Sequence, residues 1–112
     1  MFELRYYCPF DDESPFEKWF SSLDALAAAK VTVALARIEL GNLSDAKSVG
    51  DGVVEYRIHW GPGYRLYSGR DGAVLVILLL GGTKKRQQDD IKKAKLLWAA
   101  YKRAQDTQQE LK

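Results

Sequence analysis

Residues 55–67 read Glu-Tyr-Arg-Ile-His-Trp-Gly-Pro-Gly-Tyr-Arg-Leu-Tyr, and this stretch decides the fold because two alternating runs flank a turn. Alternation of apolar and polar residues is typical of half-buried strands, and Gly61-Pro62-Gly63 is typical of the turn between them. The alternation divides the first strand into an apolar and a charged face, namely Tyr56, Ile58 and Trp60 against Glu55, Arg57 and His59. The sequence therefore predicts an antiparallel hairpin with one charged face.

The length of the turn fixes which residues lie opposite each other. A three-residue loop, Gly61–Gly63, gives the pairs Trp60 with Tyr64, His59 with Arg65, and Arg57 with Tyr67. We favour this register because it buries Trp60, Tyr64 and Leu66 together. A two-residue loop would instead bring Tyr64 beside Arg57 and His59 and would move Arg65 to the other face.

Further strands are expected on both sides of this hairpin. Ala73–Leu80 is apolar at every position, which predicts a central strand covered on both faces. Residues 2–8 alternate between apolar and polar side chains and predict an N-terminal strand. Gly41–Gly52 is rich in Gly, Ser, Asp and Lys, and we expect a loop there. The strand candidates after this loop form a three-strand antiparallel meander over Val53–Trp60, Tyr64–Ser68 and Ala73–Leu80.

Three segments have helical periodicity. Ser14 and Pro15 predict the cap and first residue of a short helix, and Asp24 predicts the cap of a longer one, so the two form a helical hairpin. Gln88–Ala104 is expected to form the last helix, with the tail after about Asp106 frayed. The predicted fold class is α+β, with an N-terminal strand, a helical hairpin, a three-strand antiparallel meander and a C-terminal helix.

Length and composition restrict the class of protein. A chain of 112 residues has the length of one domain, and we assign residues 1–112 to it. Cys8 is the one cysteine, which excludes a disulfide framework and a cysteine-based zinc site; we expect no metal and no cofactor. No apolar run approaches the ~20 residues of a membrane span, and residues 1–5 lack a signal-peptide pattern. We therefore expect a soluble, cytoplasmic protein without a membrane partner.

The formal net charge of +2 is unevenly distributed along the chain. Residues 84–112 hold nine basic and four acidic side chains, whereas residues 1–51 hold five basic and nine acidic ones. A basic C-terminal third favours a local anionic partner. Lys84, Lys85 and Arg86 open this basic segment, and we expect them near Ser68 and Gly69.

Cations gathered on a sheet face suit a phosphodiester, because arginine pairs bidentately with phosphate oxygens. His59 could move a proton at neutral pH. Each of these residues also has a purely structural interpretation: His59 as a solvent-facing strand residue, Arg57 as the partner of Glu55, and Lys84–Arg86 as a solvated turn. For a lone histidine beside cations the structural interpretation is the more common one.

Two blocks of the sequence resemble the RelE/ParE superfamily. The first is the hairpin Tyr56–Tyr67. The second is Leu78–Ala94, which contains Gly81-Gly82-Thr83-Lys84 and, further on, Gln88-Asp89-Asp90-Ile91. The combination is most similar to the phage-derived addiction module killer proteins of HigB type, and the predicted order of elements matches the RelE-like fold over nearly the whole chain.

The resemblance implies a toxin of a type II toxin–antitoxin system, held inactive by a cognate antitoxin protein in a hetero-oligomer. RelE-like members cut mRNA in the ribosomal A site, so the implied partners are the ribosome and mRNA. The implied activity is that of a metal-independent endoribonuclease, an mRNA interferase that inhibits translation. In that chemistry the neighbouring 2′-hydroxyl is the nucleophile, and basic residues replace a His–His pair.

Carried over by position, the implied catalytic residues are Arg57, His59, Arg65 and Lys84. His59 would accept or donate the proton, and Arg57 would orient the scissile phosphate. Arg65 and Lys84 would stabilise the charge of the pentacoordinate phosphorane.

The same resemblance implies residues that bind the substrate. Tyr64 or Tyr67 would stack on a base, and Lys85 and Arg86 would contact the RNA. Two positions depart from the family pattern. Thr83 stands where the subfamily commonly has Asp, and no aromatic residue near Asp90-Ile91 matches the tyrosine of RelE itself.

Two other functions are compatible with the same sequence features. A ParE-like protein would poison DNA gyrase by binding and would cut no RNA. A non-catalytic RNA-binding module would retain only the fold. The combination of His59 with Arg57 and Arg65 favours the nuclease, because a pure binder has no need of a titrating group there.

Overall fold

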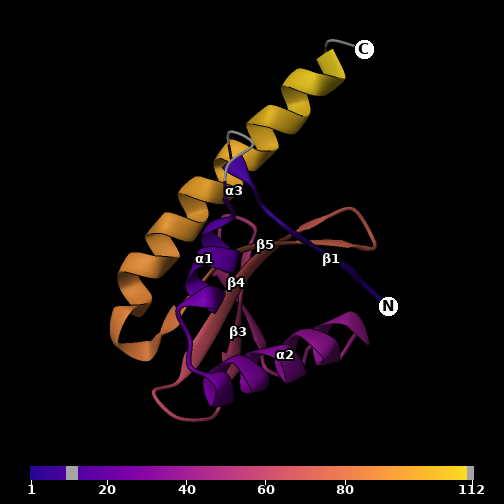
Figure 1. Cartoon of the computed structure of the whole chain (residues 1–112). Helices are drawn as coiled ribbons and strands as arrows, with labels where there is room; N and C mark the ends of the chain where they lie inside the picture. The colour runs from indigo at the N-terminus through magenta and orange to yellow at the C-terminus, as the bar shows by residue number, and fades with distance from the viewer. Residues whose placement is uncertain (10–12, 111–112) are drawn as a thin grey trace.

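The computed structural model describes residues 1–9 and 13–110, which form an α+β fold with a mixed five-strand sheet and three α-helices (Figure 1). In chain order the elements are β1 (Glu3–Tyr6), α1 (Pro15–Ser21), α2 (Ala25–Glu39), β2 (Ala46–Gly50), β3 (Val53–Ile58), β4 (Tyr64–Asp71), β5 (Leu75–Thr83), the 3₁₀ turn η2 (Lys84–Arg86) and α3 (Gln87–Glu110). No helix in this part of the chain has the length and apolar character needed to cross a membrane.

The sheet has the strand order β1-β5-β4-β3-β2. The pairs β5–β4, β4–β3 and β3–β2 are antiparallel, whereas β1 lies parallel to β5. The predicted meander is therefore confirmed. The apolar strand β5 lies between β1 and β4 and is buried over most of its length, as its uniform hydrophobicity predicted.

Helices cover both faces of the sheet, and this produces two hydrophobic clusters (Figure 1). On one face, α1 and α2 contribute Phe16, Val31 and Ile38, which pack on strand residues that include Leu66 and Leu78. On the other face, α3 contributes Ala94 and Trp98, which pack on Val53, Tyr67 and Leu79. Burying both faces removes most of the apolar surface of a short chain from water, which is the main source of its stability.

The helix starts are as predicted. The Ser14 hydroxyl accepts a hydrogen bond from the Glu17 N–H at 3.2 Å, with Pro15 as the first helical residue. The Asp24 carboxylate accepts one from the Ala27 N–H at 2.8 Å. The last helix continues to Glu110, beyond the predicted end at Ala104 and through most of the tail predicted to fray; residues 111–112 lie outside the described part.

One strand was missed. The prediction of a loop over Gly41–Gly52 is wrong for Ala46–Gly50, which forms β2 at the edge of the sheet. Only two of its residues are apolar, because an edge strand needs no continuous hydrophobic face. It turns into β3 through Gly50, Asp51 and Gly52, which all have positive φ (97°, 56° and 83°). Glycine adopts this conformation without strain, so the two glycines permit the tight connection.

The predicted register of the central hairpin is also wrong. Ile58 lies opposite Tyr64, Arg57 opposite Arg65, and Glu55 opposite Tyr67. The loop therefore spans residues 59–63 and is closed by hydrogen bonds from the Trp60 N–H to the Ile58 carbonyl and from the Gly63 N–H to the Trp60 carbonyl. A shift by an even number of residues keeps every side chain on its face, but it removes His59 and Trp60 from the ladder.

Candidate nucleic-acid site

Arg57 and Arg65 lie side by side on the face of the sheet that α3 covers, at the hairpin end. Between them and the core is Glu55, whose side chain is fully buried. The Arg57 Nε donates to Glu55 Oε1 at 3.2 Å, and the Arg65 Nε lies 3.6 Å from Glu55 Oε2. Like charges on opposite strands repel, so a shared carboxylate is what allows the two guanidinium groups to lie together.

Glu55 is hydrogen-bonded from two further sides. The Tyr67 hydroxyl donates to Oε2 at 3.1 Å and the Gln87 side-chain amide donates to the same oxygen at 2.9 Å. Burial alone would raise the pKa of Glu55, but the hydrogen bonds from Gln87, Arg57 and Tyr67, with the charge of Arg65, bring the pKa below its ordinary value. Glu55 is therefore a buried, ionised anchor for two cations.

The two arginines differ in accessibility. The Arg57 side chain is 38% exposed, whereas that of Arg65 is 7% exposed. An Arg65 terminal nitrogen, Nη1, donates to the Gly63 carbonyl at 2.9 Å, and this bond holds the hairpin loop. Arg57 can thus contact a ligand directly, and Arg65 acts on it through its charge.

Lys84 lies at the same end of the sheet. Tyr64 at the start of β4 pairs with Thr83 at the end of β5, so η2 begins beside the hairpin loop. A Cβ added to Gly63 would lie 3.3 Å from Arg65 Nη1 and 3.4 Å from the Lys84 Cβ. The expectation that this segment lies near Ser68 and Gly69 is wrong, because in an antiparallel pair the end of one strand meets the start of the other.

The side chains of Lys84, Lys85 and Arg86 are all exposed in the η2 turn. The structure brings three of the predicted cationic residues, Arg57, Arg65 and Lys84, to one end of the sheet. Lys85 and Arg86 follow Lys84 in the same turn. We call Arg57, Arg65 and Lys84 the basic cluster.

His59 does not join Arg65 on the α3 face. Its side chain is 70% exposed, and Nε2 lies 3.2 Å from Asp45 Oδ1. The ring lines a pocket of about 260 Å³ on the α2 side, together with Lys30 and Arg37. The predicted cluster of His59 with Arg65 is therefore corrected, and the physical reason is the five-residue loop. Arg57 lines this pocket too, so it is the residue common to the His59 pocket and the basic cluster.

The two predicted stacking tyrosines have different environments. Tyr67 is fully buried, and burial together with the charge of Glu55 raises the pKa of its hydroxyl. Its ring has no face open to a base, so the stacking role is corrected to that of a donor to Glu55. Tyr64 is half-buried; it stacks on Trp60 with ring centroids 6.1 Å apart and meets Trp19 edge-on at 6.0 Å.

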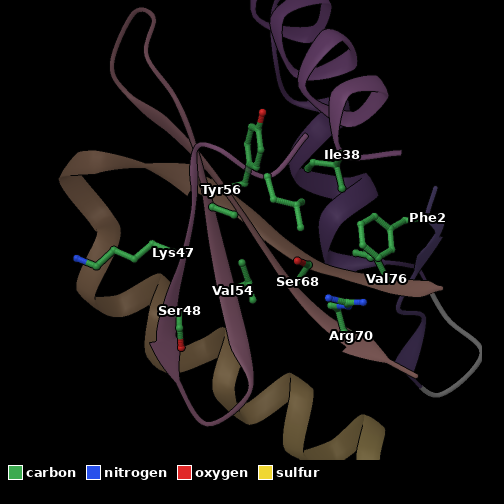
Figure 2. A pocket seen from close by; sticks show the side chains of 11 residues that line it. Phe2, Ile38, Lys47, Ser48, Val54, Tyr56, Ser68, Arg70 and Val76 are labelled. Atoms are coloured by element: carbon green, nitrogen blue, oxygen red, sulfur yellow. The ribbon is translucent and has the colours of Figure 1, made fainter. Parts of the chain in front are cut away.

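Another pocket, of about 290 Å³, lies between the end of α2 and the middle of the sheet (Figure 2). Its walls are mostly apolar and include Phe2, Ile38 and Val76, and the Arg70 guanidinium lies 4.7 Å from the centre of the Phe2 ring. In Figure 2 the Tyr56 hydroxyl points away from Arg70 and Ser68. None of the predicted site residues lines this pocket, so it is separate from the basic cluster.

Four polar residues that lie at or near the candidate site were not predicted from the sequence. Glu55, two positions before Arg57, was noted only as an alternative partner for it. Gln87 and Asp45 bond site residues from distant segments, and no local pattern indicated either contact. Asp90 was noted only as part of the second motif block, yet its side chain is buried.

The fold and the basic cluster define an α+β protein with a cationic site at one end of its sheet. The chain is similar to an uncharacterized protein of Haemophilus influenzae, with 51% identity over 83 residues that cover 73% of this chain and 84% of the relative. The chain belongs to the same family as that protein. No family model matches the chain.

Proposed function

We propose that the chain is a toxin of a type II toxin–antitoxin system that cuts mRNA on the ribosome. The observation that carries the proposal is the basic cluster: Arg57 and Arg65 paired across two strands over a buried carboxylate, with Lys84 beside them. The residues that resemble the RelE/ParE motifs supply this cluster, although they come from two separate blocks of sequence.

The reaction is a transesterification that needs no metal. The 2′-hydroxyl oxygen attacks the adjacent phosphorus, a base takes its proton, and the P–O5′ bond breaks. The products are a 2′,3′-cyclic phosphate and a 5′-hydroxyl end, which receives a proton from an acid. Arg57, the accessible arginine, grips the phosphate oxygens, while Arg65 and Lys84 stabilise the developing negative charge.

Proton transfer falls to His59, which Asp45 orients through the 3.2 Å contact. A carboxylate that contacts one ring nitrogen fixes the orientation of the imidazole. Arg57 lines the same pocket as His59, and the proposed position of the phosphate is between these two residues. The half-buried Tyr64 and its neighbour Trp60 are the aromatic surface on which a base stacks.

This function places the protein in the cytoplasm with the ribosome and mRNA as partners, and with an antitoxin that binds it in a hetero-oligomer. Amphipathic segments bind apolar grooves, and exposed Leu26, Val33 and Leu40 on α2 and its C-terminal cap are candidate contacts for such a segment.

A second candidate is a ParE-like gyrase poison or a non-catalytic RNA-binding module. The observation in its favour is the separation of His59 from Arg65, which leaves the basic cluster without a group that titrates near pH 7. Cations alone are sufficient to bind a polyanion. The two candidates therefore differ in whether His59 is needed.

Mapping the 5′ ends of transcripts in cells that express the protein tests the proposal. The wild type is expected to give codon-phased cuts in translated messages. Arg57→Ala and His59→Ala are each expected to lower the cleavage rate at least about 100-fold, the typical effect of losing a charge-stabilising or proton-transfer group. Lys92→Ala, which removes an exposed cation on α3, is the matched control and should cut normally.

Intact messages together with DNA damage would support the gyrase poison and contradict the nuclease. Cleavage that survives His59→Ala but not Arg57→Ala would remove His59 from the mechanism.

A further inference from the structure

A pocket of about 590 Å³ lies between α1, the end of β5 and the first turn of α3. It exists because β5 is longer than its neighbour. The pairing of β1 with β5 ends at Tyr6 and Leu78, whereas β5 continues to Thr83. Within residues 1–9 and 13–110, no strand pairs with Leu79–Thr83 on this edge. The volume is within the range of small-molecule and nucleotide sites.

The pocket contains a buried carboxylate that lacks a partner. Asp90 is 9% exposed, and its Oδ2 makes no hydrogen bond. A Cβ added to Gly82 would lie 1.9 Å from this oxygen, so the carboxylate occupies the space that the glycine leaves free. Most buried polar atoms are hydrogen-bonded, and an exception calls for an explanation. The Asp90 side chain is among the residues that line the pocket, so a ligand bound there lies next to this carboxylate.

Cations and an aromatic ring complete the walls. Lys18, Arg86 and Lys93 line the pocket, and all three side chains are exposed; Glu13 is the one acidic residue besides Asp90 among the described residues that line it. Trp19 lies against Gly81 so closely that a Cβ there would be 2.1 Å from its ring. The walls thus combine an acceptor for N–H donors, an aromatic surface and positive charge at the rim. This combination suits a nucleotide better than a simple anion, which a carboxylate would repel.

We propose that this pocket binds a guanine base of single-stranded RNA, with Asp90 accepting hydrogen bonds from the base and Arg86, Lys93 and Lys18 contacting the phosphates. Guanine carries two adjacent N–H donors on its Watson–Crick edge, which match the two oxygens of a carboxylate. No other standard base presents two donors in this way. Single-stranded bases are commonly recognised by stacking and by contacts to this edge.

The inference deepens the proposed function, on which it rests for the presence of RNA. The η2 turn connects the two sites: Lys84 belongs to the basic cluster, and Arg86 lines the guanine pocket. An RNA strand that follows η2 would place one nucleotide in the pocket and a neighbouring phosphate near Lys84 of the basic cluster. Asp90 would then determine the base preference of the protein, and the basic cluster would supply its general affinity for the RNA backbone.

Binding of the purified protein to short RNA tests the inference without cleavage. The probes are fluorescein-labelled oligouridine hexamers with one central guanosine or adenosine, 2′-O-methylated so that no 2′-hydroxyl can attack. By fluorescence anisotropy, the guanosine probe is expected to bind the wild type at least about fivefold more tightly, the lower limit of what one good bidentate contact provides. Asp90→Asn, which keeps the size of the side chain, should remove this preference.

Asp89→Asn is the matched control, because it makes the same change at an exposed neighbour and should keep the preference. Arg86→Ala should weaken both probes by a similar factor. A wild type without guanosine preference, or a preference that survives Asp90→Asn, would overturn the inference. Either result leaves the cleavage experiment unaffected, so failure of the pocket and failure of the nuclease proposal are distinguishable.

Discussion

Glu55 and Asp90 are both buried carboxylates on the α3 side of the molecule, and they have opposite environments. Glu55 receives hydrogen bonds from Arg57, Tyr67 and Gln87, and its pKa lies below the ordinary value. Asp90 has an oxygen with no partner, and burial raises its pKa, an effect that Arg86 and Lys93 oppose. Both oxygens of Glu55 accept hydrogen bonds within the protein, whereas Asp90 Oδ2 has no donor.

This difference indicates how each residue contributes. Both oxygens of Glu55 accept hydrogen bonds, and Arg65 lies beside the same carboxylate as an ion pair, so Glu55 fixes the geometry of the basic cluster before any ligand arrives. An unsatisfied buried acceptor costs free energy in the isolated protein. A ligand that supplies the missing donor recovers this cost, so Asp90 is suited to recognition.

The largest expected effect follows from removing the charge of Glu55. Glu55→Gln leaves the nearly buried Arg65 beside a neutral amide, and we expect the free energy of unfolding to fall by about 3 kcal/mol, the cost of breaking a buried ion pair. Urea denaturation measures this change. Glu3→Gln, in the exposed pair with Arg5, is the control and should cost less than about 1 kcal/mol. Equal effects of the two changes would show that Glu55 does not anchor the cluster.

A smaller effect is expected from filling the space beside Asp90. Gly82→Ala introduces a methyl group 1.9 Å from Oδ2, and overpacking of this kind costs about 1–3 kcal/mol. Adding Asp90→Ala to the same chain should recover most of that loss, because it removes the atom that clashes. Thermal or urea unfolding of the single and double variants forms a double-mutant cycle. Strictly additive losses would contradict the placement of Asp90 against Gly82.

The smallest effect is the pH dependence of Asp90. Its pKa is raised above 3.8, so between 3.8 and its folded pKa the folded state binds more protons than the unfolded state. Stability therefore falls as the pH rises through this window. Asp90→Asn does not titrate there, so its stability relative to the wild type should increase from acid to neutral pH.

Glu55 has the opposite sign. Its pKa is lowered from 4.5, so its contribution is complete above that value and is lost as the pH falls through the folded pKa. Urea unfolding of the wild type and both variants, Glu55→Gln and Asp90→Asn, across acid and neutral pH separates the two slopes. If the difference in free energy of unfolding between Asp90→Asn and the wild type does not change with pH, burial does not raise the pKa of Asp90, which contradicts this prediction.

Much of the fold could be predicted from local patterns. The uniform hydrophobicity of Ala73–Leu80 identified β5 as an internal strand of the sheet, and Ser14 and Asp24 identified two helix starts. Edge strand β2 could not be predicted, since Ala46–Gly50 carries little hydrophobic signal and forms a strand only because β3 offers hydrogen-bonding partners. The hairpin register depends on the number of residues in the loop, and the Gly61-Pro62-Gly63 sequence does not determine that number.

The candidate site could be predicted only in part. The face shared by Arg57 and Arg65 followed from alternation, because the register error was an even number of residues. The position of His59 did not follow, since a residue in a loop has no alternation to fix its side. The roles of Gln87 and Asp90 depend on where α3 packs against the sheet, which is a tertiary property without a local signal.

The most direct test of the central claim is primer extension on a message in a reconstituted translation reaction that contains the purified protein. We predict a cut at the codon in the ribosomal A site, with a 5′-hydroxyl on the downstream fragment, no cut without ribosomes, and no cut with Arg57→Ala. An uncut message in the presence of translating ribosomes and folded wild-type protein would contradict the account.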